Sequence, residues 1–361
     1  MKQYFLTGTY SEPILFGTGE LFTGKGEGIY LCAFEDGIIT RLNCLKLGNP
    51  SFLAIDEERK HIYAVNEMKE FQGVYGGGLT DIVYDESGRM AVVGSFPTHG
   101  GDPCHVAISP DKRYVGVANF ADGKVTVFKL DSRGNLLSEP TIFEHKGSSV
   151  HPKRQRGPHA HSILYSQDGS MFVPDLGIDQ LKAYRLTEEG VLPNDDQTVN
   201  LFPGSGPRSG EWSKDGKDFY LINELGSSIT HMRYENHAMQ KISTVSTLPS
   251  DAQTDNICAD LHLSPDGKYL YASNRGHDTI AMFSVDENGD LHSMGWIACG
   301  GKTPRNFAVD PSGRYLLVGN QDSDCIQTFQ ILENGHLSPY MRNDFPTPVC
   351  IKFFTDTTFS C

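Results

Sequence analysis

The chain has 361 residues and carries 45 acidic against 31 basic side chains, a formal net charge of −14. This charge repels nucleic acid and acidic membrane surfaces, so we expect neither as a partner. No apolar run approaches the ~18 residues of a membrane span, and the N-terminus leads into a strand-like segment instead of a signal-peptide core. We therefore expect a cytoplasmic protein.

Glycine and cysteine usage indicates the kind of fold. The 38 glycines, beside an apolar fraction of 38%, are typical of many short strands joined by turns. The eight cysteines show no CxxC or Cys/His metal spacing, and several lie inside apolar strands. We expect buried free thiols, no metal and no cofactor.

One hairpin pattern recurs along the chain: an apolar strand, a turn such as residues 214–217 (KDGK), and a second apolar strand that ends in Asn or Asp. Six copies span residues 50–66, 103–119, 160–175, 207–223, 258–274 and 304–320. A second kind of hairpin, which usually turns on an acidic-polar-Gly group, spans residues 28–42, 77–96, 124–143, 180–199, 228–247, 279–298 and 325–344.

Seven second hairpins thus stand against six first hairpins, and the missing one is divided between the chain ends. Residues 348–354 are typical of its opening strand and residues 4–10 of its closing strand. The sequence predicts an all-β fold, a seven-bladed β-propeller of four-stranded antiparallel blades whose ring is closed by pairing of the N- and C-terminal strands. A parallel βαβ fold is disfavoured because no segment between strands has a helical period. We place one domain over residues 1–354 and a C-terminal tail over 355–361.

Two insertions, residues 11–27 and 145–157, interrupt this pattern, and we expect both to cover the same face of the ring. Residues 19–25 (GELFTGK) resemble a phosphate-binding loop, but Gly26 replaces the Ser or Thr and no helix signal follows, so we interpret the segment as a flexible lid. The second insertion is basic in an acidic protein, and we predict that it binds a substrate phosphate. The basic cluster in it consists of His151, Lys153, Arg154 and Arg156.

A ring of repeats distinguishes residues that serve every blade from residues that serve one site. The position that ends the second strand is nearly constant, and we expect its side chains to bond loop backbone and serve the fold. These residues are Asn66, Asn119, Asp175, Asn223, Asn274 and Asn320.

Two other positions vary from blade to blade and mark one rim of the ring. The first strand opens with Ser51, Cys104, His161, Arg208, Ala259 or Arg305. The second strand is followed by Glu67, Phe120, Gly177, Glu224, Arg275 or Gln321. Because the rims of a propeller converge on its central channel, we expect the charged members, with His105 nearby, to face one small volume.

These residue types define a reaction class. Arginines supply permanent positive charge for a carboxylate, a phosphate or an oxyanion, while histidine and glutamate transfer protons near neutral pH. Neither a G-x-S-x-G elbow nor an HExxH motif is present. The set suits addition of water to an activated anionic carbonyl compound, or the reverse ring closure.

A resemblance to the lactonase family of seven-bladed propellers runs over nearly the whole chain. It is carried by GGDPCHVAISPDKRYVGVANF, GPHAHSILYSQDG, SGPRSGEWSKDGKDFYLINELGSSIT, LHLSPDGKYLYASNRGHDTI and KTPRNFAVDPSGRYLLVGNQDSD. The family contains bacterial 6-phosphogluconolactonases and fungal carboxymuconate lactonising enzymes. The resemblance implies that His161 is the acid/base residue and that Arg208, Glu224 and Arg275 complete the catalytic set. Departures from the family pattern occur at Ser209, Gln167 and Pro174.

We therefore expect hydrolysis of 6-phosphoglucono-δ-lactone, with His161 or Glu224 as the base. Substrate-binding residues are predicted to be Arg305, His105, His159, Glu67 and Arg156, with the phosphate on Arg305, His105 or the basic insertion. The alternatives are a carboxymuconate lactonising enzyme, a metal-dependent sugar lactonase using Glu67, Asn119, Asp175 and Asn223 as oxygen ligands, and a propeller that only binds partners. The expected partner is a small anionic lactone, bound by a monomer or weak homodimer.

Overall fold

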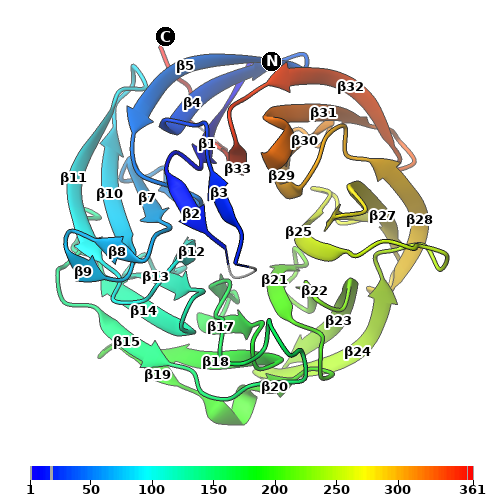
Figure 1. Ribbon diagram of the computed structural model, residues 1–361, viewed down its shortest axis with the longest axis horizontal. Coiled ribbons are helices and arrows are strands. Elements are labelled where there is room, and N and C mark those ends of the chain that lie inside the picture. The colour runs from blue at the N-terminus through cyan, green and yellow to red at the C-terminus, as the bar shows by residue number, and fades with distance from the viewer. Residues whose placement is uncertain (1, 17–18, 356, 361) are drawn as a thin grey trace.

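Seven antiparallel sheets stand around a central axis in the computed structural model, which describes residues 2–16, 19–355 and 357–360 (Figure 1). This is the predicted all-β, seven-bladed propeller. The described residues contain no α-helix and only two 3₁₀ turns, η1 (Asp195–Gln197) and η2 (Gln321–Ser323). None of their helices has the length and apolarity needed to cross a membrane.

Each blade runs from an inner strand at the channel to an outer strand at the circumference (Figure 1). Blade I contains β33 (Pro348–Phe353), β1 (Gln3–Thr9), β4 (Gly28–Glu35) and β5 (Ile38–Lys46). Blade II contains β6 (Leu53–Asp56), β7 (His61–Asn66), β10 (Gly78–Tyr84) and β11 (Met90–Pro97). Blade III contains β12 (Pro103–Ile108), β13 (Tyr114–Asn119), β14 (Lys124–Lys129) and β15 (Thr141–Glu144). Blade IV contains β16 (Leu164–Tyr165), β17 (Ser170–Asp175), β18 (Gln180–Leu186), β19 (Val191–Pro193) and β20 (Val199–Asn200). Blade V contains β21 (Pro207–Trp212), β22 (Asp218–Asn223), β23 (Ser228–Glu235) and β24 (Ala238–Ser246). Blade VI contains β25 (Ile257–Leu263), β26 (Tyr269–Arg275), β27 (Thr279–Val285) and β28 (Leu291–Ala298). Blade VII contains β29 (Pro304–Val309), β30 (Tyr315–Asn320), β31 (Cys325–Ile331) and β32 (Leu337–Asp344).

Two small hairpins lie outside the blades. One pairs β2 (Pro13–Leu15) with β3 (Leu21–Thr23), and the other pairs β8 (Glu70–Phe71) with β9 (Val74–Tyr75).

Burial along the strands explains their sequences. The second strand of a blade is covered on both faces by its neighbours, and β13 (YVGVAN) is accordingly buried at every position. The outer strand β24 is exposed at most positions, which is why its sequence is polar. Blade IV departs from the four-strand pattern because η1 divides its outer strand into β19 and β20, which both pair with β18.

Tyrosines in the second strand tie several blades to the next. The hydroxyls of Tyr63, Tyr220 and Tyr271 donate to the carbonyls of turn glycines in the following blade, at 2.6, 2.8 and 2.9 Å. All three rings are fully buried. The hydrophobic clusters also lie between blades, so the sheets are held by their neighbours and not by one common centre.

The ring closes as predicted. β1 pairs with β33 from Phe5 opposite Phe353 to Thr9 opposite Pro348. The tail beyond residue 354 packs on the ring: Phe359 is buried between Tyr4 and Tyr84. Its carbonyl also accepts a hydrogen bond from the Tyr4 hydroxyl at 3.1 Å.

The column of strand-ending amides serves the fold, as predicted. All five asparagines are at most 1% exposed. Asn119, for example, donates to the Lys124 carbonyl at 3.0 Å, and Asn274 donates to the Thr247 carbonyl at 2.9 Å. The seven described cysteines are free, and all but Cys44 are buried, which confirms the expectation of free thiols; Cys361 lies outside the described residues.

Candidate functional site

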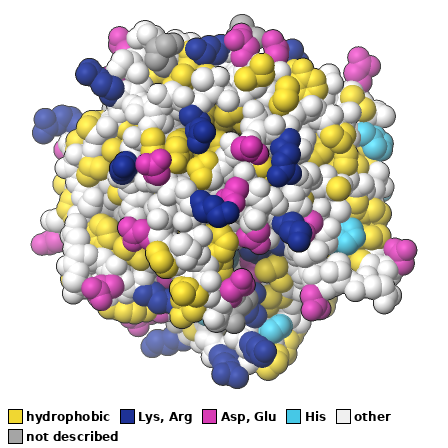
Figure 2. Space-filling model, turned by 45° about the horizontal axis from the view of Figure 1, so that its top comes forward, with side chains coloured by type: hydrophobic (Ala, Val, Ile, Leu, Met, Phe, Trp, Pro, Cys, Tyr) yellow, Lys and Arg dark blue, Asp and Glu magenta, His cyan; other side chains and the backbone are white. Residues whose placement is uncertain are grey.

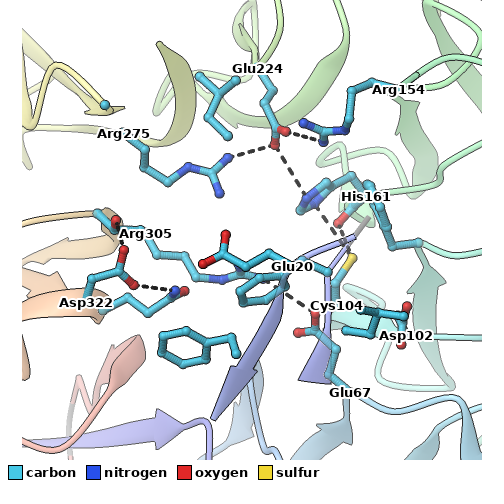
Figure 3. A pocket seen from close by; sticks show the side chains of 18 residues that line it. Glu20, Glu67, Asp102, Cys104, Arg154, His161, Glu224, Arg275, Arg305 and Asp322 are labelled. Carbon is cyan, nitrogen blue, oxygen red and sulfur yellow. Dashed lines mark hydrogen bonds and ion pairs between the residues drawn. The ribbon is translucent and has the colours of Figure 1, made fainter. Parts of the chain in front are cut away.

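A cavity of about 290 Å³ opens among side chains of the rim (Figure 3). The β2–β3 hairpin lies over the channel on this face (Figure 1). Its wall combines charged side chains from the predicted rim with aromatic side chains from the hairpin and blade III. Both predicted insertions contribute, through Phe16, Glu20 and Phe22 from the first and Arg154 from the second. In the oblique view of Figure 2, acidic and basic side chains are interspersed over the surface, so the positive charge of the site is local.

Glu224 is the centre of the charged cluster. It follows β22 and is 2% exposed. Its Oε1 accepts from Nη2 of Arg154 at 2.6 Å, and its Oε2 accepts from Nη2 of Arg275 at 2.9 Å and Nε of Arg208 at 3.0 Å. Burial alone would raise the pKa of this carboxyl, but the three guanidinium groups hold it well below its usual range. Glu224 is therefore a carboxylate throughout the physiological pH range.

His161 lies beside this cluster. Its Nε2 is 4.0 Å from Oε2 of Glu224, and its Nδ1 is 3.7 Å from the Cys104 sulfur. Burial and the positive charge of Arg208 lower the pKa of His161 well below its usual value, against the smaller raising effect of Glu224. The imidazole is therefore neutral at pH 7 and has a nitrogen available as a proton acceptor. The same burial raises the pKa of Cys104 above its usual range, which keeps the neighbouring thiol protonated.

Arg275 retains an unused hydrogen-bond donor. Its Nη2 is shared between Glu224 and the Cys258 carbonyl, at 2.9 and 2.8 Å, whereas its buried Nε has no partner among the described residues. Burial and the neighbouring arginines lower the pKa of Arg275 to about 10, although Glu224 opposes the shift. The Arg275 side chain lines the cavity, so its guanidinium offers positive charge to an incoming anion or a developing oxyanion.

Arg305 belongs to a second cluster on the opposite wall. Its Nη2 is 3.6 Å from Oε1 of Glu67, and its guanidinium lies over the rings of Tyr10 and Phe16, 5.2 and 5.8 Å from their centroids. The Tyr10 hydroxyl donates to the other oxygen of Glu67 at 2.9 Å. Although burial opposes it, Tyr10 and Glu67 hold the pKa of Arg305 above its usual range. This cluster joins the β2–β3 hairpin to the rim.

The structure brings together most of the residues predicted from the variable columns. His161, Glu224, Arg275, Arg305 and Glu67 all line the cavity. Arg208 lines a smaller adjoining cavity of about 20 Å³, where its guanidinium also donates to the Ala259 carbonyl.

Three predicted substrate-binding residues do not line the main cavity. Arg156 is exposed, and its Nε donates to the Pro152 carbonyl at 2.6 Å. His159 stacks on Phe120 and bonds its carbonyl through Nδ1 at 2.7 Å. His105 stacks on Phe52, 4.1 Å between ring centroids, and lines only the smaller cavity.

Other lining residues were not selected from the sequence. Arg154 was noted only as one member of a basic cluster. It lines the cavity and bonds Glu224, whereas Arg156, which was predicted to bind substrate, does not line it. Phe16 and Phe22 lie in an insertion without any repeat, so no column could identify them. Asp102 precedes the first strand of blade III and lines the cavity. The equivalent position in the other blades is not acidic, so the repeat gave no reason to select it.

The first insertion forms a hairpin instead of a phosphate loop. Its strands β2 and β3 pair, and Phe16 and Phe22 pack on Tyr10, with ring centroids 5.7 and 6.0 Å away. A Cβ on Gly24 would lie 2.1 Å from the Tyr10 carbonyl oxygen, so this glycine is required by close packing. Lys25 bonds Thr347 through its backbone. The glycines that resembled a phosphate loop therefore fix the hairpin to the ring; residues 17 and 18 lie outside the described part of the chain.

Two of the four residues predicted for the metal alternative have engaged oxygens. Asp175 accepts from His145 and from the His159 backbone, at 2.6 and 2.7 Å, and Glu67 accepts from Tyr10. Oδ1 of Asn119 and Oδ1 of Asn223 are buried without a partner among the described residues. Within the described residues, no group of three or more His, Cys, Asp or Glu side chains has an arrangement that could hold a metal ion.

The fold and the site have the arrangement expected of a β-propeller enzyme: polar rim residues from different blades surround one cavity at the channel mouth. The family profile described as "Lactonase, 7-bladed beta-propeller" matches residues 4–353, and the chain belongs to this family.

Relatives with a name align with most of this chain and with most of their own length. It is 31% identical over 300 residues to a 6-phosphogluconolactonase of Bacillus subtilis, covering 81% of this chain and 84% of the relative. It is 32% identical over 303 residues to a 6-phosphogluconolactonase of Formosa agariphila, covering 80% and 84%. Among solved structures, the periplasmic gluconolactonase of Pseudomonas aeruginosa matches with a TM-score of 0.90 and 32% identity, covering 98% of this chain and 99% of that one.

Proposed function

We propose that the protein is a 6-phosphogluconolactonase-like carboxylic ester hydrolase that opens a phosphorylated sugar δ-lactone with water. The observation that carries the proposal is that the Arg275 guanidinium and a neutral His161 line one cavity beside Glu224. An oxyanion donor and a proton acceptor are the two groups that this reaction requires. The names of the Bacillus and Formosa relatives support the same substrate class.

In this proposal His161 accepts the proton. Both oxygens of Glu224 are bonded by arginines, so a proton on this carboxylate would break its ion pairs. Nε2 of His161, in contrast, has no hydrogen-bond partner among the described residues. The role of Glu224 is to orient Arg275 and Arg208 and to stabilise the imidazolium that forms on His161. General base assistance of this kind contributes ~10²–10⁴ in rate.

The proposed reaction uses one water and leaves the enzyme unchanged. His161 takes a proton from water as the oxygen attacks the lactone carbonyl, and the carbonyl oxygen becomes an oxyanion beside the Arg275 guanidinium. The tetrahedral adduct then collapses with cleavage of the bond to the ring oxygen, which receives the proton from His161. One well-placed oxyanion donor contributes roughly 10²–10³, so these two terms suffice for a reactive δ-lactone without a covalent intermediate.

A kinetic test separates the site from the scaffold. Glu224→Gln and His161→Ala are each expected to lower kcat at least ~10²-fold. The exposed control substitutions Glu235→Gln and His292→Ala should leave kcat unchanged. Initial rates of 6-phosphoglucono-δ-lactone opening are measured by acid release, with the uncatalysed rate subtracted. Wild-type activity in the Glu224→Gln and His161→Ala proteins, or no activity in the wild type, would reject the proposal.

A second candidate substrate is the unphosphorylated glucono-δ-lactone. The carboxylates of Glu20, Asp102 and Asp322 line the cavity together with the arginines, and carboxylates are good acceptors for sugar hydroxyls. The Pseudomonas structural relative is named a gluconolactonase. Because that relative is also named periplasmic, a cytoplasmic location stays a prediction for this chain.

A further inference from the structure

The insertion between blades III and IV, residues 145–157, is here called the basic loop. It carries four of the basic side chains near the cavity, but only one of them, Arg154, lines it (Figure 3). The loop is long and has little regular structure. Its position therefore depends on the contacts that hold its two ends.

Three successive residues at the exit of β17 hold the loop. Asp175 accepts from Nδ1 of His145 at the start of the loop, at 2.6 Å. The Leu176 carbonyl accepts from the side chain of Gln155, which is fully buried, at 2.9 Å. A Cβ on Gly177 would lie 1.9 Å from the Gly157 carbonyl oxygen, so a glycine is required where the loop ends.

Gly177 also occupies a special position in the repeat. In other blades the equivalent position supplies Glu67, Glu224 or Arg275 to the cavity. Blade IV supplies no side chain there, and the basic loop packs against this position and contributes Arg154 instead. The place of Arg154 in the cavity wall is thus set by packing, because the basic loop that carries it fits against Gly177 and would clash with any larger residue there.

The Arg154 side chain also keeps donors that no described residue of the cavity uses. The only hydrogen bond of its side chain within the described residues is the one from Nη2 to Glu224, and its guanidinium lies 6.0 Å from the Phe120 ring centroid. Arg208 is engaged by Glu224 and by a backbone carbonyl. Arg305 is engaged by Glu67 and two aromatic rings.

The position of Arg154 relative to Arg275 matches the substrate. The two arginines bond different oxygens of Glu224 and therefore lie on different sides of that carboxylate (Figure 3). In a 6-phosphorylated δ-lactone, the phosphate is attached a few bonds from the ring oxygen that leaves. A lactone whose carbonyl oxygen is at Arg275 therefore carries its phosphate close to the reacting bond, where a second arginine is needed.

We propose that Arg154 binds the phosphate group of the substrate and thereby determines the preference for a phosphorylated over an unphosphorylated lactone. This inference rests on the proposed function. It assigns the phosphate to Arg154, and excludes Arg305, His105 and the exposed Arg156, which the sequence left open. A planar guanidinium with several free N–H groups is the side chain best suited to bind phosphate oxygens.

The test compares two lactones that differ only in the phosphate. Wild type, Arg154→Gln, Arg154→Lys and the matched control Arg156→Gln are assayed with 6-phosphoglucono-δ-lactone and glucono-δ-lactone. Arg154→Gln should lower kcat/KM for the phosphorylated lactone roughly 10- to 100-fold more than for the unphosphorylated one, chiefly through KM. Arg154→Lys should recover part of this preference, and Arg156→Gln should retain all of it. Equal losses on both substrates would mean that Arg154 only positions Glu224, and would overturn the inference.

A binding measurement separates this inference from the proposed function. Calorimetric titration with 6-phosphogluconate and with gluconate reports phosphate recognition without turnover. The wild type should bind 6-phosphogluconate more tightly, and Arg154→Gln should bind both acids alike. If the wild type binds both acids alike, or if Arg154→Gln keeps the difference, the inference is wrong. If the wild type shows the difference but opens neither lactone, the proposed function fails while the phosphate site stands.

Discussion

At the scale of single residues, the carboxylates Glu224 and Asp102 of the cavity differ in how they are paired. Glu224 is stabilised by three arginines. Asp102, on the opposite wall, is 6% exposed, and its Oδ1 is buried with no partner among the described residues. Its nearest cation is Lys69, at 3.5 Å from Oδ2. Burial and the negative charge of Glu67 raise the pKa of Asp102 to about 6.

This shift predicts a stability change with a definite sign. The pKa of Asp102 in the folded protein, about 6, lies above the ordinary value of 3.8. Its ionisation therefore costs the folded state nothing below pH ~4 and progressively destabilises it as the pH rises through 6. Asp102→Asn should raise the free energy of unfolding by about 1–3 kcal/mol at pH 7.5 and leave it unchanged at pH 4. Urea unfolding at both pH values measures this, and an equal effect at the two pH values would contradict the assignment.

At the scale of elements, the two insertions act in different ways. The β2–β3 hairpin reaches over the channel mouth and rests on Tyr10, which in turn bonds Glu67 and faces Arg305 (Figure 1). The basic loop is held at blade IV and supplies Arg154. One insertion thus covers the cavity with aromatic surface, and the other adds a charge to its wall.

The hairpin's attachment predicts a position where a methyl group is not tolerated. A Cβ on Gly24 would meet the Tyr10 carbonyl oxygen at 2.1 Å and the Tyr10 Cβ at 2.5 Å. Gly24→Ala should cost about 1–3 kcal/mol of stability and raise KM, because Tyr10 must move away from Glu67. Gly190→Ala is the control, since no atom lies within 4 Å of a Cβ there. Thermal unfolding and lactone kinetics on both variants check the prediction, and an unaltered Gly24→Ala enzyme would refute it.

The sequence predicted these two elements unequally. Blade strands were located because their apolar runs and turn residues recur, and Glu224 and Arg275 were selected because they break that recurrence. The insertions occur once each, so nothing in the chain offered a comparison. As a result Gly24 was interpreted as part of a flexible lid when it is fixed by packing, and Arg156 was preferred to Arg154. Which of two arginines in a loop points inward depends on Gln155 and Gly177, and these contacts are tertiary.

At the scale of the whole molecule, the ring depends on contacts between its two ends. The first and last strands share one sheet, and the final residues add to the joint. Phe359 packs on Tyr4, Tyr84 and Phe354, with ring centroids between 5.1 and 5.9 Å. The backbone of Ser360 donates to the Glu86 carbonyl at 2.9 Å. Residues 357–360 thus join blade I to blade II on the outside of the closure.

This joint predicts a loss of stability without a loss of chemistry. Phe359→Ala should cost about 3–5 kcal/mol, the usual range for a buried phenylalanine. The cavity is lined by other parts of the chain, so kcat and KM at 25 °C should stay at wild-type values. Denaturant unfolding followed by lactone kinetics on the folded variant tests both halves. A stability equal to wild type would show that the tail does not contribute to the closed ring.

Closure by the last strand also concerns how the protein is made. β1 precedes every other blade strand along the chain, yet its inner neighbour β33 follows all of them. Throughout translation the nascent chain therefore carries a strand with one unpaired backbone edge, the kind of surface that invites pairing with other chains. Until β33 is synthesised, this edge of β1 has no partner within the ring and is open to pairing with other chains.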